Sequence, residues 1–331
     1  MARNMKKTKP HKNGKVRGVR PIKDRHNMTI VVVGETAIGK TYRTLNEILC
    51  YLQDNKVTGK KGRKVLIFDV NDDDYIRFIT LHLDHIRQFK QVRARRIRPL
   101  TKSGRLMTLA EKRAVVEKLV TEFKDGLLVL EDLDKYMVGA KGQTIVGVLC
   151  ANRHSNLDIL ISHQSLAKIT TTEWQNMTWL RLHKQVDDIY RYRNRIPNYP
   201  LVRMATFIVE EQYNLANHAY EQGWIDDHEF VKRKSYFIYL DMRRLKIRGC
   251  SRKAFIRAAK RYIDQEENKK VKMLCQETDA HGVPLYAKRT DAVFQLISNY
   301  LRFHEVSELS PIEEREERRK EDDGENQKMA A

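Results

Sequence analysis

Short apolar runs recur along the chain, and segments in which apolar residues return every three or four positions lie between them. The first run, MTIVVV at 28–33, is apolar at almost every position, so it predicts a strand that is buried on both faces. Runs of the same kind predict strands at 64–70, 126–130, 157–162, 178–183 and 235–241. This alternation favours an α/β fold with a mostly parallel sheet and helices on both of its faces.

Two of the segments with helical spacing carry clear signals. The segment 40–55 starts directly after a glycine-rich stretch, and the segment 108–123 opens with Thr108 and Glu111 at the spacing of a capping box. One face of the first helix is predicted to carry Tyr42, Leu45, Ile48, Leu49 and Leu52. Both helices are expected to pack on the sheet through their apolar residues.

The ends of the chain differ in composition from its middle. Residues 1–26 are rich in Lys and Arg and poor in apolar residues, which predicts a disordered basic arm. We expect one α/β domain at 27–265, followed at 266–331 by a helical appendage and a flexible charged tail. A plain solvated arm and an arm that binds DNA or RNA remain open as alternatives for the first segment.

Net charge narrows the choice of partner. The chain has 331 residues, with 63 Lys and Arg against 43 Asp and Glu, and a formal net charge of +20. A charge of this sign and size favours a polyanionic partner, most often nucleic acid. A merely soluble basic protein and a protein that binds an anionic membrane surface are the alternatives.

Features of an exported or membrane protein are missing from the pattern. No apolar run reaches the roughly 18 residues of a transmembrane helix, and the first residues lack the apolar segment of a secretory signal. The four cysteines lie far apart and form no Cys-x-x-Cys pair, which is typical of reduced thiols. We therefore expect a cytoplasmic protein.

The stretch GETAIGKT at 34–41 matches the phosphate-loop pattern G-x-x-x-x-G-K-[ST]. Its backbone N–H groups would surround a phosphate, and the helix that follows would point its positive end at the anion. Lys40 is expected to reach the β- and γ-phosphates, and the Thr41 hydroxyl to bind Mg²⁺. The residues predicted to bind ATP are Gly34, Glu35, Thr36, Ala37, Ile38, Gly39, Lys40, Thr41 and Tyr42.

A phosphate-loop site also needs an acidic residue on a neighbouring strand, and GLLVLED at 126–132 supplies one in the pattern of a Walker B strand. The usual order is Asp then Glu, whereas this chain has Glu131 then Asp132. By register, Glu131 takes the metal side and Asp132 the position of the base that polarises the attacking water. The opposite assignment remains open, and Asp134 is a third candidate.

The segment RHSNLDILISHQS at 153–165 follows the Walker B strand. A polar residue at the tip of this neighbouring strand can contact the γ-phosphate or the attacking water, and Gln164 is our candidate for this sensor, with Ser162 second. Arg153 precedes the strand, where in a ring it could reach the ATP of the next subunit as an arginine finger. An ordinary surface arginine is an equal alternative for Arg153.

Taken together, residues 28–185 resemble the FtsK/HerA superfamily of DNA-pumping ATPases. The resemblance rests on GETAIGKT, KVLIFDVNDDDY, LLVLED and RHSNLDILISHQS. The small viral branch is most similar, namely the genome-packaging ATPases of tailless icosahedral viruses and the zonular occludens toxin-like assembly proteins of filamentous phages. The resemblance implies a RecA/ASCE-like P-loop fold for the motor domain (27–265) and a homo-hexameric ring that threads DNA. It also implies a capsid or portal vertex partner, and a place in the host cytoplasm or virion.

Basic side chains cluster between two predicted elements, in RARRIRP and KSGR. A basic loop that faces the channel of a ring would follow the DNA backbone without reading sequence. A solvated loop is the alternative. The candidate DNA contacts are Arg93, Arg95, Arg96, Arg98, Lys102 and Arg105.

Three functions remain in competition. The motif set and the positive charge favour an ATP-hydrolysing DNA translocase that packages a viral genome. A nucleotide-dependent ATPase for virion assembly, extrusion or secretion is the second. A small-molecule kinase is the third, but the chain shows no motif for an acceptor pocket or a lid.

Overall fold

The computed structural model describes residues 27–54, 61–133, 136, 147 and 156–305. The predicted basic arm, the end of the charged tail, Asp134 and Arg153 lie outside the described residues. Within them, the strands form one sheet in the order β3-β2-β4-β5-β1-β6-β7-β8. The strands are β1 (Thr29–Val33), β2 (Lys64–Phe68), β3 (Ala94–Ile97), β4 (Gly126–Leu130), β5 (Leu157–His163), β6 (Trp179–His183), β7 (Phe237–Asp241) and β8 (Lys246–Arg248).

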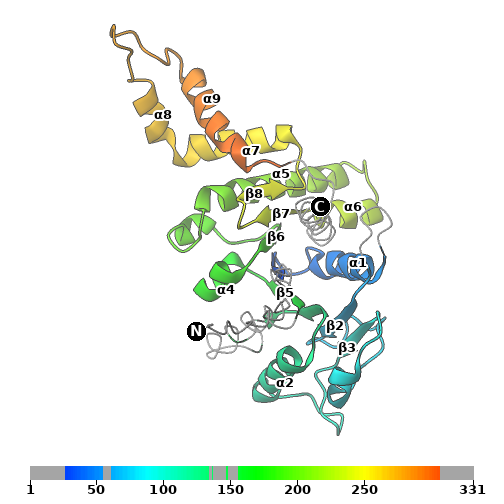
Figure 1. Cartoon of the computed structure of the whole chain (residues 1–331). Helices are drawn as coiled ribbons and strands as arrows, with labels where there is room; N and C mark the ends of the chain where they lie inside the picture. The colour runs from blue at the N-terminus through cyan, green and yellow to red at the C-terminus, as the bar shows by residue number, and fades with distance from the viewer. Residues whose placement is uncertain (1–26, 55–60, 134–135, 137–146, 148–155, 306–331) are drawn as a thin grey trace, which may run out of the picture.

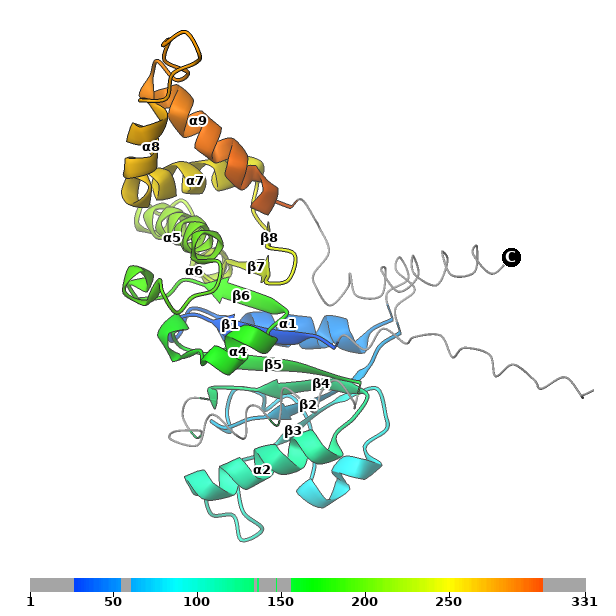
Figure 2. The same cartoon turned by 60° about the vertical axis from the view of Figure 1, so that its left-hand side comes forward.

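The sheet is parallel from β3 to β6, and β7 and β8 continue it in antiparallel pairing. Figure 2 shows the strands stacked in this order, with β8 near the top and β3 near the bottom. The predicted α/β fold with a mostly parallel sheet is therefore confirmed. Strand β5 lies between β1, which leads into the phosphate loop, and β4, the Walker B strand. The segments that follow β1 and β4 therefore lie on either side of β5.

Helices cover both faces of the sheet (Figure 1). The α-helices are α1 (Lys40–Leu52), α2 (Leu109–Glu122), α4 (Thr171–Asn176), α5 (Tyr199–Glu221), α6 (Asp227–Lys234), α7 (Arg252–Glu266), α8 (Asn268–Leu274) and α9 (Arg289–Tyr300). Short 3-10 turns are η1 (Leu83–Gln88), η3 (Leu166–Lys168), η4 (Ile189–Tyr192) and η5 (Leu301–Phe303).

Alternate residues of β1 pack on opposite faces of the sheet. Ile30 and Val32 pack in one cluster with Ile48 of α1, whereas Val31 and Val33 pack in another with residues of α4 and α5. On the second face, α2 covers β2 and β4 in a third cluster. Because every residue of β1 is buried, the continuous apolar run has no solvent face, as its pattern predicted.

The helix α2 confirms the capping box. Thr108 Oγ1 accepts from the Glu111 backbone N–H, and the Glu111 carboxylate accepts from the Thr108 N–H. These two bonds satisfy donors that the first turn of a helix leaves without partners.

The buried face predicted for α1 is wrong in detail. The buried side chains are Thr44, Glu47, Ile48 and Tyr51 together with Lys40, whereas Tyr42 is 41% exposed. Polar residues occupy the inner face because partners on the sheet neutralise them, and a pattern that counts only apolar residues places that face incorrectly.

A group of helices projects from one end of the sheet, above α5 in both views (Figures 1 and 2). In this group α7 packs on α5, and α9 packs on α7 and α8. The basic segment 242–262 contains β8 and most of α7. In the part of the chain that the structure describes, no helix is both long and apolar enough to cross a membrane.

Candidate nucleotide-binding and hydrolysis site

The candidate site lies at the edge of the sheet where the parallel strands end. Val33 of β1 pairs with His163 of β5, and Leu130 of β4 pairs with Ile161 of β5. The residues that follow these three strands therefore emerge beside one another. This register brings together the phosphate loop, the Walker B acids and Gln164, which the sequence spreads over more than a hundred positions.

The phosphate loop is anchored on the two strands that flank β1. Gly34 N–H donates to His163 O at 3.4 Å, and Glu35 N–H donates to Lys184 O at 2.9 Å. Inside the loop, Lys40 Nζ donates to Gly34 O at 2.6 Å and to Glu35 O at 2.8 Å. The loop therefore closes around its own ammonium group, which holds the lysine at the centre of the turn.

Burial lowers the pKa of Lys40, and the nearby carboxylates of Asp132 and Glu131 oppose this shift. The ammonium group is thus within electrostatic reach of both acids that follow β4. A buried ammonium group that is held by two carbonyls of the phosphate loop and lies near two carboxylates is suited to bind the phosphates of a nucleotide.

At two positions of the loop, the local geometry explains why the residue is glycine. Gly39 has φ +92, and a Cβ there would lie 2.6 Å from Cβ of Ser235. A Cβ on Gly34 would lie 2.6 Å from Cβ of His183. Ala37 also has positive φ, at 61. Of the residues expected to bind nucleotide, Gly34, Ile38 and Lys40 are buried, Glu35, Gly39 and Thr41 are half-buried, and Thr36, Ala37 and Tyr42 are exposed.

The two Walker B acids occupy different environments. Glu131 is 4% exposed, and the hydroxyl of Tyr75 donates to its Oε1. Burial raises the pKa of Glu131, and the bond from Tyr75 opposes that rise. Asp132 is half-buried and has φ +44, in the left-handed region that most residues avoid. The strand therefore presents one fixed, buried carboxyl and one on a sharp turn.

The oxygen donors at this edge fit a magnesium ion. Mg²⁺ prefers hydroxyl, carboxylate and phosphate oxygens, usually with one or two protein carboxylates and several waters. The side chains of Thr41, Glu131 and Asp132 offer only oxygen atoms as metal ligands. Both carboxylates interact electrostatically with the Lys40 ammonium group. These side chains therefore offer the type of donor that Mg²⁺ prefers.

Gln164 follows β5 directly and is half-buried, next to the strand end on which Gly34 is anchored. Its neighbour His163 is fully buried, and His163 Nε2 lies 2.9 Å from Glu173 Oε1. Glu173 also receives the backbone N–H of Thr170 at the start of α4. The tip of β5 is therefore held rigidly, so Gln164 starts from a fixed backbone position.

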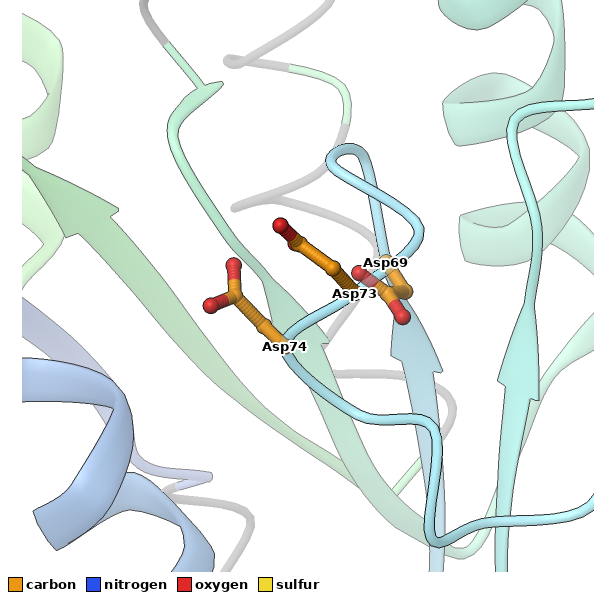
Figure 3. A group of neighbouring side chains, drawn as sticks. All are labelled: Asp69, Asp73 and Asp74. Carbon is orange, nitrogen blue, oxygen red and sulfur yellow. The ribbon is translucent and has the colours of Figure 1, made fainter.

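A group of three acids stands at the end of β2, beside the Walker B strand (Figure 3). Asp69, Asp73 and Asp74 bring carboxylate oxygens within 4.8 Å of one another. Asp69, however, is paired with Arg96, at 2.7 Å between Oδ2 and Nη1. We interpret the segment as a structural turn. It also carries Tyr75, the last residue of the stretch KVLIFDVNDDDY, for which the sequence predicted no role.

A buried polar network lies beneath the loop helix. Arg181 of β6 donates from Nη1 to Glu47 Oε2 at 2.5 Å and from Nη2 to Thr44 Oγ1 at 2.6 Å. The same Nη2 lies 3.3 Å from Lys40 O, and the hydroxyl of Tyr239 donates to Glu47. The sequence offered one signal for this network, an arginine in the middle of the apolar strand TWLRLH.

The expected basic loop is in part a strand, because residues 94–97 form β3 at the edge of the sheet. Within this partly buried strand, Arg96 is neutralised by Asp69, which lies in the turn after β2. Arg93 is exposed and Arg95 is half-buried. The ion pairs are Arg96 with Asp69, Arg98 with Asp72, Lys102 with Asp84, and Arg105 with Glu111.

No family model matches the chain, and no curated protein matches it. Among solved structures it is similar to the genome packaging NTPase B204 from Sulfolobus turreted icosahedral virus 2 in complex with AMPPCP. That match has a TM-score of 0.42 and 15% identity over 67% of this chain and 95% of the other. The DNA-packaging ATPase B204 from Sulfolobus turreted icosahedral virus has a TM-score of 0.38 and 13% identity, over 66% and 95%.

The N-terminal domain of zonular occludens toxin from Neisseria meningitidis is also similar, with a TM-score of 0.28 and 12% identity over 47% of this chain and 75% of the other. These solved structures belong to the two groups of proteins that the sequence motifs resemble. At TM-scores below 0.5 the likeness is distant, and the proposed function rests on the residues of this chain.

Proposed function

We propose that this chain is an ATP-hydrolysing DNA translocase that works as a homo-hexameric ring and pumps a viral genome into a capsid. The observation that carries the ATPase part is the position of Lys40. Its ammonium group is enclosed by the phosphate loop and lies within the field of Glu131 and Asp132 from another strand. The groups that we assign to the phosphates and to the metal therefore lie together at one edge of the sheet, which supports the proposal.

The roles of the residues follow from their surroundings. Lys40 would exchange the carbonyl oxygens of its own loop for phosphate oxygens when ATP enters. Mg²⁺, held by Thr41 and Glu131, would neutralise charge on the β- and γ-phosphates. Asp132 would orient the attacking water and accept its proton, and Gln164 would contact the γ-phosphate. Arg153 of a neighbouring subunit would stabilise the charge of the transition state.

The DNA part of the proposal is supported by the net charge of +20 and by the basic segment around β3. Backbone phosphates would meet Arg93, Arg95 and Lys102 without sequence readout. A capsid or portal vertex protein is the partner that genome packaging requires. The second candidate function, a virion assembly or secretion ATPase, uses the same site and differs in having no response to DNA.

The ATPase part is tested with Lys40→Ala and Asp132→Asn. Both variants should lower the rate of ATP hydrolysis by at least about 100-fold, the scale on which removing one catalytic group acts. Lys40→Ala should also lose affinity for ATP, whereas Asp132→Asn should retain it, since Asp132 is assigned to the water.

Lys90→Ala, an exposed lysine between η1 and β3, serves as the matched control and should hydrolyse ATP normally. Full hydrolysis by Lys40→Ala would contradict the site. Loss of ATP affinity in Asp132→Asn would contradict its assignment as the base.

A further inference from the structure

Tyr75 is a fully buried tyrosine in the turn that follows β2. Its side chain is 0% exposed and belongs to the core cluster on the α1 face of the sheet. The ring stacks on Phe78, with 6.4 Å between centroids. Its hydroxyl donates to Glu131 Oε1, across 56 positions of sequence. The packing of the ring therefore fixes the direction from which the hydroxyl reaches the carboxylate.

The hydrogen bond gives Glu131 a defined orientation. A carboxylate whose oxygen is already held does not lose rotational freedom when the metal–nucleotide complex binds. Partners that orient metal ligands in this way contribute about 10- to 100-fold to metal affinity or activity.

The turn that carries Tyr75 is itself held by Asp69. Tyr75 N–H donates to Asp69 Oδ2 at 3.3 Å, and Asp72 N–H donates to Asp69 Oδ1 at 3.1 Å. Arg96 of β3 donates to the same Oδ2 at 2.7 Å. One buried carboxylate thus joins the start of the turn, its middle, its end and the edge strand.

A second arginine holds the turn from outside. Arg98 Nε and Nη2 each donate to a different oxygen of Asp72, both at 2.6 Å. This two-bond geometry fixes direction as well as distance. Asp72 has φ 65, a left-handed conformation that a non-glycine residue keeps only when its surroundings hold it. Arg96 of β3 and Arg98 just after it therefore hold the turn, and the turn positions Tyr75.

We propose that Tyr75 is a positioning residue that orients the Glu131 carboxylate toward the metal–nucleotide complex, and that Arg96 and Arg98 brace the turn that carries it. Tyr75 acts through Glu131 and is not itself a catalytic group. This inference rests on the proposed function, because it requires that Glu131 serves a bound metal–nucleotide complex.

The test uses Tyr75→Phe in the full chain, with Mn²⁺ as a spectroscopic substitute for Mg²⁺ and a non-hydrolysable ATP analogue. Electron paramagnetic resonance should show Mn²⁺ binding to the protein–nucleotide complex weakened by about tenfold or more. Nucleotide affinity in EDTA should remain within about twofold of wild type, because Lys40 and the loop are intact. The kcat for ATP should fall by about tenfold or more, with KM for ATP nearly unchanged.

Tyr51→Phe is the matched control. Tyr51 is also buried, and its hydroxyl donates to a buried carboxylate, Asp158 Oδ2, at 2.8 Å. Asp158 lies near the N-terminal end of β5, whereas the candidate site lies at the C-terminal ends of the parallel strands. Tyr51→Phe should therefore bind Mn²⁺ as the wild type does. Equal weakening in both variants would overturn the proposal, because the effect would then be general destabilisation.

Asp72→Asn tests the brace separately and keeps the inference testable if Tyr75→Phe fails to fold. It removes the charge that Arg98 holds and leaves Tyr75 in place, so Mn²⁺ binding should weaken in the same direction but less. Unchanged Mn²⁺ binding in Asp72→Asn would overturn the brace, and unchanged binding and kcat in Tyr75→Phe would overturn the role of Tyr75.

A wild-type chain that binds no nucleotide would instead contradict the proposed function. If wild type binds Mn²⁺ with nucleotide and Glu131→Gln loses it, the site stands, and a normal Tyr75→Phe then counts against this inference alone.

Discussion

Arg181 and Glu47 form a buried ion pair between the central strand β6 and the phosphate-loop helix α1, with 2.5 Å between Nη1 and Oε2. The side chain of Arg181 is 0% exposed and that of Glu47 is 11% exposed. Burial raises the pKa of Glu47, and the charge of Arg181 opposes the rise. The pair fixes the helix whose first turn forms the candidate phosphate site, so it links the stability of the fold to the geometry of the loop.

Removing one member of this pair should strongly destabilise the protein. Arg181→Met leaves an uncompensated carboxyl inside the core, and we expect the free energy of unfolding to fall by about 3–5 kcal/mol. The double variant Arg181→Met/Glu47→Gln keeps an acceptor for Tyr239 without the charge, and should recover at least half of that decrease. Urea denaturation measures both. A decrease below about 1 kcal/mol in the single variant would mean that the pair contributes little.

Gly39→Ala should disturb the fold far more than Gly104→Ala. Both glycines have positive φ, at +92 and +82, so both substitutions carry backbone strain of about 1 kcal/mol. Only Gly39 has a steric conflict, since its Cβ would lie 2.6 Å from that of Ser235, whereas a Cβ on Gly104 meets nothing within 4 Å. We expect Gly39→Ala to lower both thermal stability and ATP affinity. Equal effects of the two substitutions would show that strain alone decides.

Stability should depend on His183 between pH 7 and pH 5. Burial, with the charges of Arg181 and Lys40, holds the pKa of His183 well below its usual 6.5. The unfolded chain therefore takes up a proton below about pH 6.5 that the folded chain does not, so stability falls as pH falls.

In His183→Leu this contribution is absent, and the decrease in unfolding free energy from pH 7 to pH 5 should be smaller by about 2 kcal/mol. Denaturation curves at both pH values measure it. An identical decrease in the variant and in the wild type would show that His183 titrates normally.

Arg93, Arg95 and Arg96 should differ in their effect on DNA binding. Arg93 is exposed and Arg95 half-buried, whereas Arg96 is buried against Asp69. The double variant Arg93→Ala/Arg95→Ala should keep its stability and reduce the slope of log K against log salt by about 1 for each DNA phosphate that the protein no longer neutralises. Arg96→Ala should mainly lower stability. Wild-type salt dependence in the double variant would remove these two residues from the interface.

Much of the fold was predictable because strands buried on both faces leave an unmistakable pattern. The runs at 28–33, 64–70 and 126–130 each became a parallel strand, and the capping box at Thr108 began a helix where expected. The edge strand β3 was missed because its sequence, ARRI, is as basic as a solvated loop. Its buried arginine, Arg96, is neutralised by Asp69, which only the folded chain brings near.

The sequence predicted the motif residues of the candidate site but not the residues that hold them in position. GETAIGKT and LLVLED identify Lys40 and the two acids, because phosphate and metal chemistry restrict residue type and spacing. Tyr75 and Arg181 have no such restriction. Their roles depend on which side chains meet across the sheet, and that information lies in strand register and not in local sequence.

The central claim is an ATP-driven ring that moves DNA and in which neighbouring subunits share each active site. It is tested most directly by mixing two inactive variants. Lys40→Ala lacks its own phosphate site but supplies Arg153, and Arg153→Ala keeps its phosphate site but lacks the finger. ATP hydrolysis is measured with and without DNA for the wild type, for each variant and for the mixture. We predict hydrolysis that DNA stimulates in the wild type and that the mixture partly restores; hydrolysis indifferent to DNA, with no activity in the mixture, would contradict it.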